Sequence, residues 1–136
     1  MTKQILVVDD SKAVRDAIRF LLRSQPELAI CGEAQDGVGA IEKAQKLRPD
    51  LILLDLAMPN LNGAIAASIL KRTLPGTPII LFTMYEQAVD ALASAIGVDI
   101  VLSKPDGLDH LVEMISGLID PRGEQNNDRS VENYLR

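Results

Sequence analysis

Polar residues of chemically useful types follow the short apolar runs of this sequence. Asp9 and Asp10 follow the first run, Asp55 the third, Thr83 the fourth and Lys104 the fifth. Carboxylates gathered in one place repel one another, and a hard divalent cation such as Mg²⁺ relieves that repulsion through oxygen ligands. A lysine and a hydroxyl facing these acids would suit an incoming phosphoryl group. Because the set contains no serine, histidine or cysteine nucleophile, a carboxylate is the best candidate acceptor.

The apolar runs predict the strands that would position these residues. None of the runs alternates with polar residues, which is typical of strands covered on both faces in a parallel sheet. The run at residues 28–31 is the weakest of them. The predicted strands are Ile5–Val8, Leu28–Cys31, Leu51–Leu54, Ile79–Phe82 and Ile100–Leu102.

The segments between the runs carry apolar residues at helical spacing, as helices packed on a sheet do. One predicted helix follows Tyr85, and the others follow residues that make good N-caps. These caps are Ser11, Asp36, Asn62 and Asp106. The alternation predicts a doubly wound α/β domain, (βα)5, with a five-stranded parallel sheet. Since the carboxyl ends of the strands form the ligand crevice of such sheets, the acids, Thr83 and Lys104 are expected to converge there.

Length and composition indicate one folded domain. The chain has 136 residues, of which 47% are hydrophobic and 24% charged, as in globular proteins with an apolar core. Residues 1–120 carry the strand and helix pattern, whereas residues 121–136 are polar. We therefore expect a domain over 1–120 and a polar C-terminal tail or linker remnant over 121–136.

Several kinds of protein are disfavoured by composition. The net charge of −5 and the aromatic content of 3% argue against direct nucleic-acid contact. A single cysteine, Cys31, and a single histidine, His110, leave no material for a disulfide or a zinc cluster. The sequence shows no signal peptide and no apolar run of the ~20 residues that span a bilayer. The expectation is a cytoplasmic chain without a membrane partner.

The sequence resembles the receiver domain of bacterial two-component response regulators over roughly residues 3–119. The spacing of the motifs together is specific, whereas the acidic pair alone would be weak. The motifs are Val7–Ser11, Leu53–Gly63 with Met58-Pro59, Leu81–Thr83 and Ser103–Pro105. The sequence of residues 48–83 is similar to that of receivers of the nitrate-regulator branch. The resemblance implies a flavodoxin-like, chemotaxis-regulator-like fold with strand order 2-1-3-4-5.

The resemblance also implies a Mg²⁺ site beside the first and third strands. Asp10 would bind the metal directly, and Asp9 would act mainly through a bound water. Asp55 would contribute a carboxylate oxygen, and Ala57 would contribute its backbone carbonyl oxygen. Gly63 would allow the loop after Asp55 to turn into the following helix.

By the same resemblance, Asp55 is the phosphoacceptor. Thr83 would bind the phosphoryl oxygen and move with it, and Lys104 would pair first with the carboxylate and then with the phosphate. The Lys104–Pro105 bond would be cis. The implied function is that of a signalling phosphoacceptor, which is no enzyme beyond assisting its own phosphorylation and dephosphorylation.

The implied phosphoryl donor is a sensor histidine kinase or a phosphotransfer protein. The output would be an interaction with a partner protein or a second copy, through the face made by strand 100–102 and the helices on either side of it. Three positions depart from the family pattern: Val101 replaces the usual aromatic residue, Met84 replaces a small one, and Asp106-Gly107 follows Lys-Pro where the family often has Phe. The first two departures predict a longer-lived phosphorylated form and a switch that relies less on an aromatic swing.

Other functions remain open at this point. A receiver-shaped scaffold that takes no phosphate would have the same fold. A haloacid-dehalogenase-like phosphatase also uses Asp, Thr or Ser, Lys and Mg²⁺, but it needs an Asp-x-Asp motif where this chain has adjacent Asp9 and Asp10. A flavin-binding domain of this fold holds a phosphate in its first loop, and here Asp9 and Asp10 would repel that phosphate. A DNA-binding regulator would need several tens of residues beyond Pro121.

Overall fold

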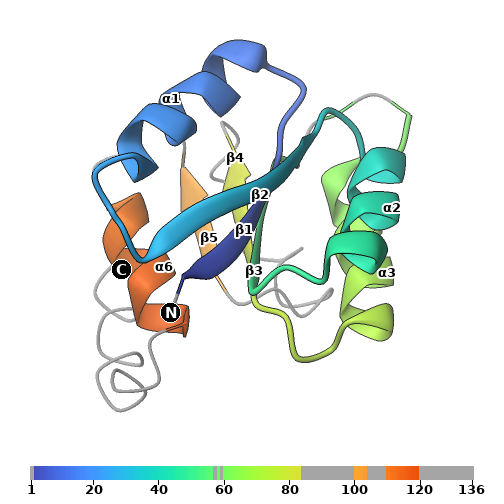
Figure 1. The fold of residues 1–136 in the computed structure, drawn as a ribbon. Coiled ribbons are helices and arrows are strands. Elements are labelled where there is room, and N and C mark those ends of the chain that lie inside the picture. Colours follow the sequence, from blue (N-terminus) through green and yellow to red (C-terminus); the bar gives the residue numbers. More distant parts are fainter. Residues whose placement is uncertain (1, 57, 59, 84–99, 104–109, 120–136) are drawn as a thin grey trace.

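The computed structural model describes residues 2–56, 58, 60–83, 100–103 and 110–119 (Figure 1). The predicted helix after Tyr85, the cap at Asp106 and the tail over 121–136 lie outside these residues. The described strands are β1 (Lys3–Val8), β2 (Leu28–Ala34), β3 (Leu51–Leu54), β4 (Ile79–Thr83) and β5 (Ile100–Ser103). The described helices are α1 (Lys12–Leu22), α2 (Gly37–Leu47), α3 (Gly63–Thr73) and α6 (Leu111–Ile119).

The strands form one five-stranded parallel sheet in the order β2-β1-β3-β4-β5. The predicted fold class and strand order are therefore confirmed. The chain runs outward from β1 to β2, then returns across β1 to β3 and continues to β4 and β5. The reversal of direction lies between β1 and β3, where the resemblance placed the acidic residues.

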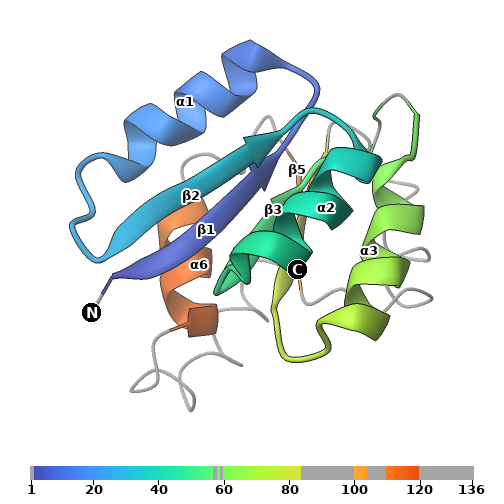
Figure 2. The same cartoon turned by 45° about the vertical axis from the view of Figure 1, so that its right-hand side comes forward.

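The helices cover both faces of the sheet (Figures 1 and 2). The sheet therefore separates two hydrophobic cores, one on each face. Alternate residues of each strand face opposite sides, so Val7 and Leu53 belong to one core and Val8 and Leu54 to the other. Large side chains of α1 and α6 fill the first core: Ile18, Leu22, Leu111, Met114 and Ile115. Alanines of α2 and α3 line the second core: Ala40, Ala44, Ala66 and Ala67. The small side chains let α2 and α3 lie close to the sheet.

Strand β2 is longer than predicted because it lies at the edge of the sheet. The predicted strand ended at Cys31, whereas β2 continues through Gly32 and Glu33 to Ala34. Edge strands are half-exposed, so polar residues are tolerated and the apolar signal stops early. The pairing with β1 also shifts, since Ile5 pairs with Ile30 while Leu6 pairs with Gly32. Cys31 is the extra residue at this bulge, and partial burial raises the pKa of its thiol.

Three helices begin at the predicted N-cap residues. The Ser11 hydroxyl accepts a hydrogen bond from the amide of Val14 at 3.3 Å. The Asp36 carboxylate accepts one from Gly39 at 2.7 Å, and the Asn62 side chain accepts one from Ile65 at 3.0 Å. These caps satisfy amides at the helix starts that have no partner within the helix. Ser11 and Asp36 follow the ends of β1 and β2 by three and two residues, and Asn62 follows the end of β3 by eight. All three helices therefore begin after the carboxyl ends of strands, where the candidate site lies.

Candidate functional site

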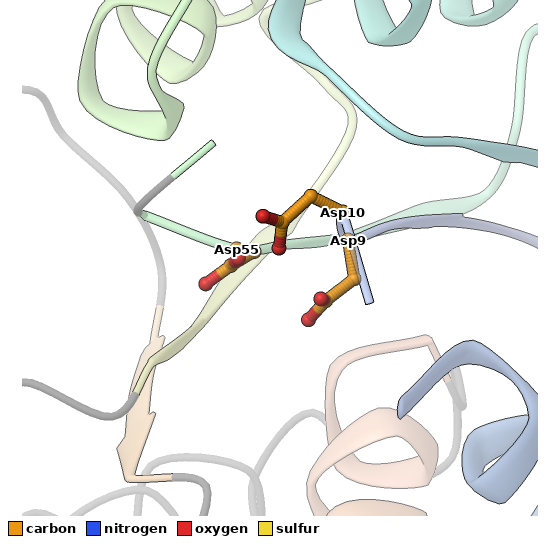
Figure 3. Close-up of side chains that lie close together, drawn as sticks. All are labelled: Asp9, Asp10 and Asp55. Carbon is orange, nitrogen blue, oxygen red and sulfur yellow. The ribbon is translucent and has the colours of Figure 1, made fainter. Parts of the chain in front are cut away.

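The carboxyl ends of β1 and β3 bring three aspartates together (Figure 3). Val8 pairs with Leu54, and the amide of Asp55 donates to the Val8 carbonyl at 2.9 Å, so the two strands end side by side. One carboxylate oxygen from each of Asp9, Asp10 and Asp55 lies within 4.8 Å of the others. Asp9 and Asp55 are 2% and 4% exposed, whereas Asp10 is exposed. The predicted convergence of the three acids is confirmed.

The donor set of this cluster fits a hard divalent cation. Three carboxylates at such short separations repel one another, and burial of two of them weakens the screening by water. Oxygen ligands with a high negative charge are those that Mg²⁺ binds in proteins. The exposed Asp10 leaves one side of the cluster accessible to an incoming ion. The cluster can therefore hold a metal ion of this class.

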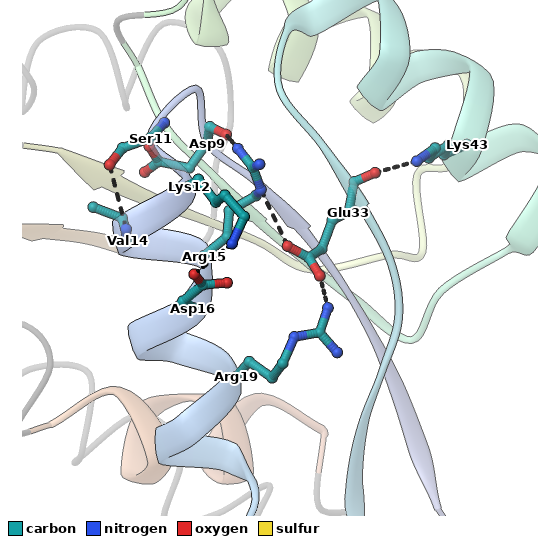
Figure 4. Close-up of polar contacts among 9 residues, drawn as sticks. All are labelled: Asp9, Ser11, Lys12, Val14, Arg15, Asp16, Arg19, Glu33 and Lys43. Carbon is teal, nitrogen blue, oxygen red and sulfur yellow. Dashed lines mark hydrogen bonds and ion pairs between the residues drawn. The ribbon is translucent and has the colours of Figure 1, made fainter.

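Hydrogen bonds fix the turn that carries Asp9. The Asp9 amide donates to the Ala34 carbonyl at 3.0 Å, which extends the pairing of β1 with β2. The Ser11 amide donates to Asp9 Oδ1 at 2.9 Å. The Arg15 guanidinium donates from Nη1 to the Asp9 carbonyl at 2.6 Å (Figure 4). The main chain and the carboxylate of Asp9 are thus both held by neighbours.

Sequence reasoning missed Arg15 and its partner Glu33. Arg15 Nε donates to Glu33 Oε1 at 3.1 Å, and the other carboxylate oxygen of Glu33 pairs with Arg19 (Figure 4). Lys43 of α2 donates to the Glu33 carbonyl. The available signal was weak: Arg15 and Arg19 are four residues apart on one helix face, but Glu33 is 18 residues further along the chain than Arg15.

Gly63 is required because helix α3 begins against the backbone of Asp55. Its amide donates to the Leu56 carbonyl at 2.8 Å. A Cβ atom on Gly63 would lie 2.0 Å from the Asp55 carbonyl oxygen and 2.7 Å from Leu56 Cα. The sequence suggested a need for turning freedom, whereas the structure shows a close approach of two backbone segments.

The loop after Asp55 is also tied to the start of α2. Asn60, in the left-handed region at φ 67°, donates from its side-chain amide to Asp36 at 2.8 Å. The Gly37 amide donates to the Leu61 carbonyl at 3.0 Å. Hydrogen bonds from the Gly39 amide and from Asn60 lower the pKa of Asp36 below its usual value. The loop after Asp55 is therefore held by hydrogen bonds to the start of α2.

The remaining predicted site residues are only partly described. Thr83 is the last residue of β4 and pairs with Ser103 of β5, which places its backbone at the same edge of the sheet as the acids. The side chain of Thr83 lies outside the described part of the structure, as do Ala57, Lys104 and the predicted cis bond. Their roles stay predictions.

Comparisons with known proteins identify the family of this chain. The family model of the response regulator receiver domain matches residues 5–116. A protein-glutamate methylesterase/protein-glutamine glutaminase of Pyrococcus horikoshii is 40% identical over 93 residues, which are 68% of this chain and 25% of that protein. The response regulator protein VraR of Staphylococcus saprophyticus is 36% identical over 118 residues, which are 85% of this chain and 56% of that protein. The chain thus spans between about a quarter and about half of the length of these relatives.

Solved structures show the same fold. The response regulator domain of Thermotoga maritima CheB has a TM-score of 0.81 at 31% identity and covers 88% of this chain and 98% of that one. The receiver domain of NarL from Mycobacterium tuberculosis has a TM-score of 0.81 at 26% identity, with 89% and 98% covered. The NarL match agrees with the branch that residues 48–83 resemble, and the CheB match shows that the likeness extends beyond that branch.

Within the described residues, no helix has the length and apolar character needed to cross a membrane. The family match, the strand order and the cluster of Asp9, Asp10 and Asp55 all agree. The chain belongs to the response regulator receiver domains of two-component systems.

Proposed function

We propose that Asp55 is the residue on which this receiver domain accepts its phosphoryl group. The observation that carries the proposal is the position of Asp55, which is 4% exposed at the end of β3 with its carboxylate within 4.8 Å of Asp9 and Asp10. In the transfer, a carboxylate oxygen of Asp55 attacks phosphorus as the bond from phosphorus to the donor atom breaks. The product is an acyl phosphate, and the leaving group of the donor takes up a proton.

The three aspartates would hold Mg²⁺, together with the carbonyl oxygen of Ala57. Bound Mg²⁺ supplies positive charge that offsets the charge of the carboxylates and of the phosphoryl oxygens. Asp10 is exposed and therefore suited to direct contact with the ion, whereas the amide of Ser11 already occupies one oxygen of Asp9. This difference supports the assignment of Asp9 to a contact through water.

Thr83 and Lys104 complete the proposed site. The backbone of Thr83 lies at the same sheet edge as the acids, which supports a role for its hydroxyl as a donor to the phosphoryl group. Lys104 follows Ser103, the last residue of β5 and the partner of Thr83 in the sheet. A lysine placed there would pair with the acceptor carboxylate and afterwards with the phosphate.

Receiver domains take their phosphoryl groups from histidine kinases and phosphotransfer proteins, and we propose such a donor for this chain. The receiver domain is itself a phosphoacceptor and no enzyme, although proteins similar to it include methylesterases. A partner protein or a second copy contacting β5 and its flanking helices stays a prediction. So do the cytoplasmic location and the limits of 1–120 for the domain and 121–136 for the tail.

The proposal is tested by phosphorylation with acetyl phosphate in the presence and absence of Mg²⁺, followed by intact mass. We expect the mass of one phosphoryl group to appear only with Mg²⁺, and Asp55→Asn to abolish it. Asp50→Asn is the matched control, because Asp50 flanks the other end of β3 and hydrogen-bonds to Gln4. Full modification of Asp55→Asn would overturn the assignment. Absence of modification in the wild-type chain would favour the scaffold that takes no phosphate.

A further inference from the structure

Arg15 links the acidic turn to the edge strand of the sheet. We propose that Arg15 is a positioning residue that holds the Asp9–Asp10 turn in its metal-binding geometry, and that Glu33 orients Arg15 for this role. This inference rests on the proposed function, since it assigns to Arg15 an effect on the cation that Asp9, Asp10 and Asp55 would hold. Its effect passes through the main chain of Asp9 and not through a direct contact with the ion.

The Asp9 residue is fixed at its amide, its carbonyl and its carboxylate. The amide bond to Ala34 continues the β1–β2 ladder, and the bond from Ser11 fixes one carboxylate oxygen. The carbonyl is held by Arg15 Nη1 at 2.6 Å, which is short for a hydrogen bond from a charged donor. The carbonyl belongs to the peptide group that joins Asp9 to Asp10. Loss of the Arg15 contact would therefore free the peptide plane that sets the direction of both acidic side chains.

Glu33 is placed to orient the arginine. It pairs with Val7 in the sheet, and Val7 faces the core that is filled by α1. The carboxylate of Glu33 therefore lies beside α1, where it pairs with Arg15 and with Arg19 (Figure 4). The side chains of Arg15 and Glu33 are only 15% and 23% exposed, whereas that of Arg19 is 51% exposed. The Arg15–Glu33 pair is thus screened less by solvent than the outer pair.

A positioning role and a mere charge effect predict opposite results. If Arg15 acted only through its charge, its removal would leave the site more negative and Mg²⁺ would bind more tightly. If Arg15 positions the turn, its removal loosens the ligands and Mg²⁺ binds more weakly. Loss of a partner that orients metal ligands lowers metal affinity by roughly 10–100-fold in other proteins. The sign of the change in Mg²⁺ affinity therefore separates the two explanations.

The test is a Mg²⁺ titration of the unphosphorylated chain, followed by the amide NMR shifts of Asp10 and Ser11. We expect Arg15→Gln to weaken Mg²⁺ binding by about tenfold. The matched control is Arg19→Gln, which removes the same charge from the same helix and the same Glu33 partner. Arg19→Gln should change the affinity by less than about twofold, because its contact is more exposed and lies one helical turn further along α1. Equal effects of the two variants, or tighter binding by Arg15→Gln, would overturn the inference.

Two further variants separate the charge of Arg15 from its hydrogen-bonding geometry. Arg15→Lys retains the charge but has no planar fork to bind Asp9 and Glu33 together, so we expect an affinity between wild type and Arg15→Gln. The double variant Arg15→Gln/Glu33→Gln restores the net charge. A charge effect predicts wild-type affinity for it, whereas the positioning role predicts an affinity as low as that of Arg15→Gln alone.

The outcome for the wild-type chain separates the inference from the proposed function. If the wild-type chain binds Mg²⁺ and Asp10→Asn does not, the proposed site stands, and the Arg15 variants decide the inference alone. If the wild-type chain binds no Mg²⁺ at the acidic turn, the proposed function and the inference both fail. Thermal midpoints measured without Mg²⁺ show whether any variant has lost its fold.

Discussion

The two ends of strand β3 carry the same residue type in different surroundings. Asp50 precedes the four buried residues of the strand and Asp55 follows them. At the first end, Asp50 accepts a hydrogen bond from the Gln4 amide through its carboxylate, and its own amide donates to the Gln4 carbonyl, both at 2.7 Å. At the second end, the Asp55 amide continues the pairing with β1, and the carboxylate lies with those of Asp9 and Asp10.

This comparison shows that the residue type does not decide the role. The Asp50 carboxylate replaces a backbone acceptor and thereby joins β1 to β3, which is a structural task. The Asp55 carboxylate adds repulsion to a cluster that is already acidic, and a bound divalent cation would offset that repulsion. If the two ends differ in this way, substitutions at each end should have different consequences.

The largest loss of stability is expected from a substitution beside Asp55. Gly63→Ala should lower the free energy of unfolding by roughly 2–4 kcal/mol, since the added Cβ would lie 2.0 Å from the Asp55 carbonyl oxygen and the backbone must shift. Gly76→Ala is the control, because a Cβ there meets nothing within 4 Å. Urea unfolding should show the control unchanged or slightly more stable. Equal midpoints for the two variants would contradict the close approach at Gly63.

The opposite end of β3 should depend on a hydrogen bond and not on charge. Asp50→Ala removes the acceptor of the Gln4 amide and should lower the free energy of unfolding by about 1–2 kcal/mol. Asp50→Asn keeps an oxygen that can accept this bond and should lose less than half as much. Neither variant should alter the rate of phosphorylation by acetyl phosphate. Slower phosphorylation of Asp50→Asn would contradict a purely structural role for Asp50.

Mg²⁺ should stabilise the folded chain by binding at the end of β3 that carries Asp55. An ion that binds only the folded state adds about 1.4 kcal/mol at ten times its dissociation constant. The thermal midpoint of the wild-type chain should therefore rise with Mg²⁺ and return when the ion is removed with EDTA. Asp10→Asn should lose this rise, and without Mg²⁺ it should be more stable than wild type because the repulsion among the acids is reduced. A Mg²⁺-dependent rise that persists in Asp10→Asn would contradict the cluster as its origin.

The smallest effect is a pH dependence at Asp36, which ties the loop after Asp55 to α2. Hydrogen bonds from Gly39 and Asn60 lower the pKa of Asp36 in the folded chain below its usual value of 3.8. A lowered folded pKa contributes stability that is present above the usual value and is lost as the pH falls through the folded one. The stability difference between wild type and Asp36→Asn should therefore shrink below about pH 4 in urea midpoints. A difference that does not vary with pH would contradict this origin.

Local signals in the sequence predicted most of the fold. Continuous apolar runs predicted the strands, and the caps Ser11, Asp36 and Asn62 mark helix starts because each acts on an amide three residues away. The acidic cluster was also predictable, because parallel strands that end at one edge bring their following residues together. The end of β2 was not, since Gly32 and Glu33 lie on an edge strand where burial no longer selects apolar residues.

The support around the acidic turn could not be predicted because it depends on contacts between distant residues. Arg15 reaches Glu33 only because β2 pairs with β1 in a shifted register that places Glu33 beside Val7. The shift itself arises at the bulge between Ile30 and Gly32. A glycine inside a strand is a weak signal of a bulge, but it does not give the register that follows. The reason for Gly63 is similar, since its close neighbour is the backbone of Asp55 and not a residue of its own turn.

We propose that Asp55, and not another aspartate, accepts the phosphoryl group. The most direct measurement is reduction of the phosphorylated chain with borohydride, which converts a phosphorylated aspartate to homoserine, followed by peptide sequencing by mass spectrometry. We expect homoserine at position 55 and aspartate at positions 9, 10 and 50 in chains treated with acetyl phosphate and Mg²⁺. Homoserine at Asp9, Asp10 or Asp50 with an unmodified Asp55 would contradict it.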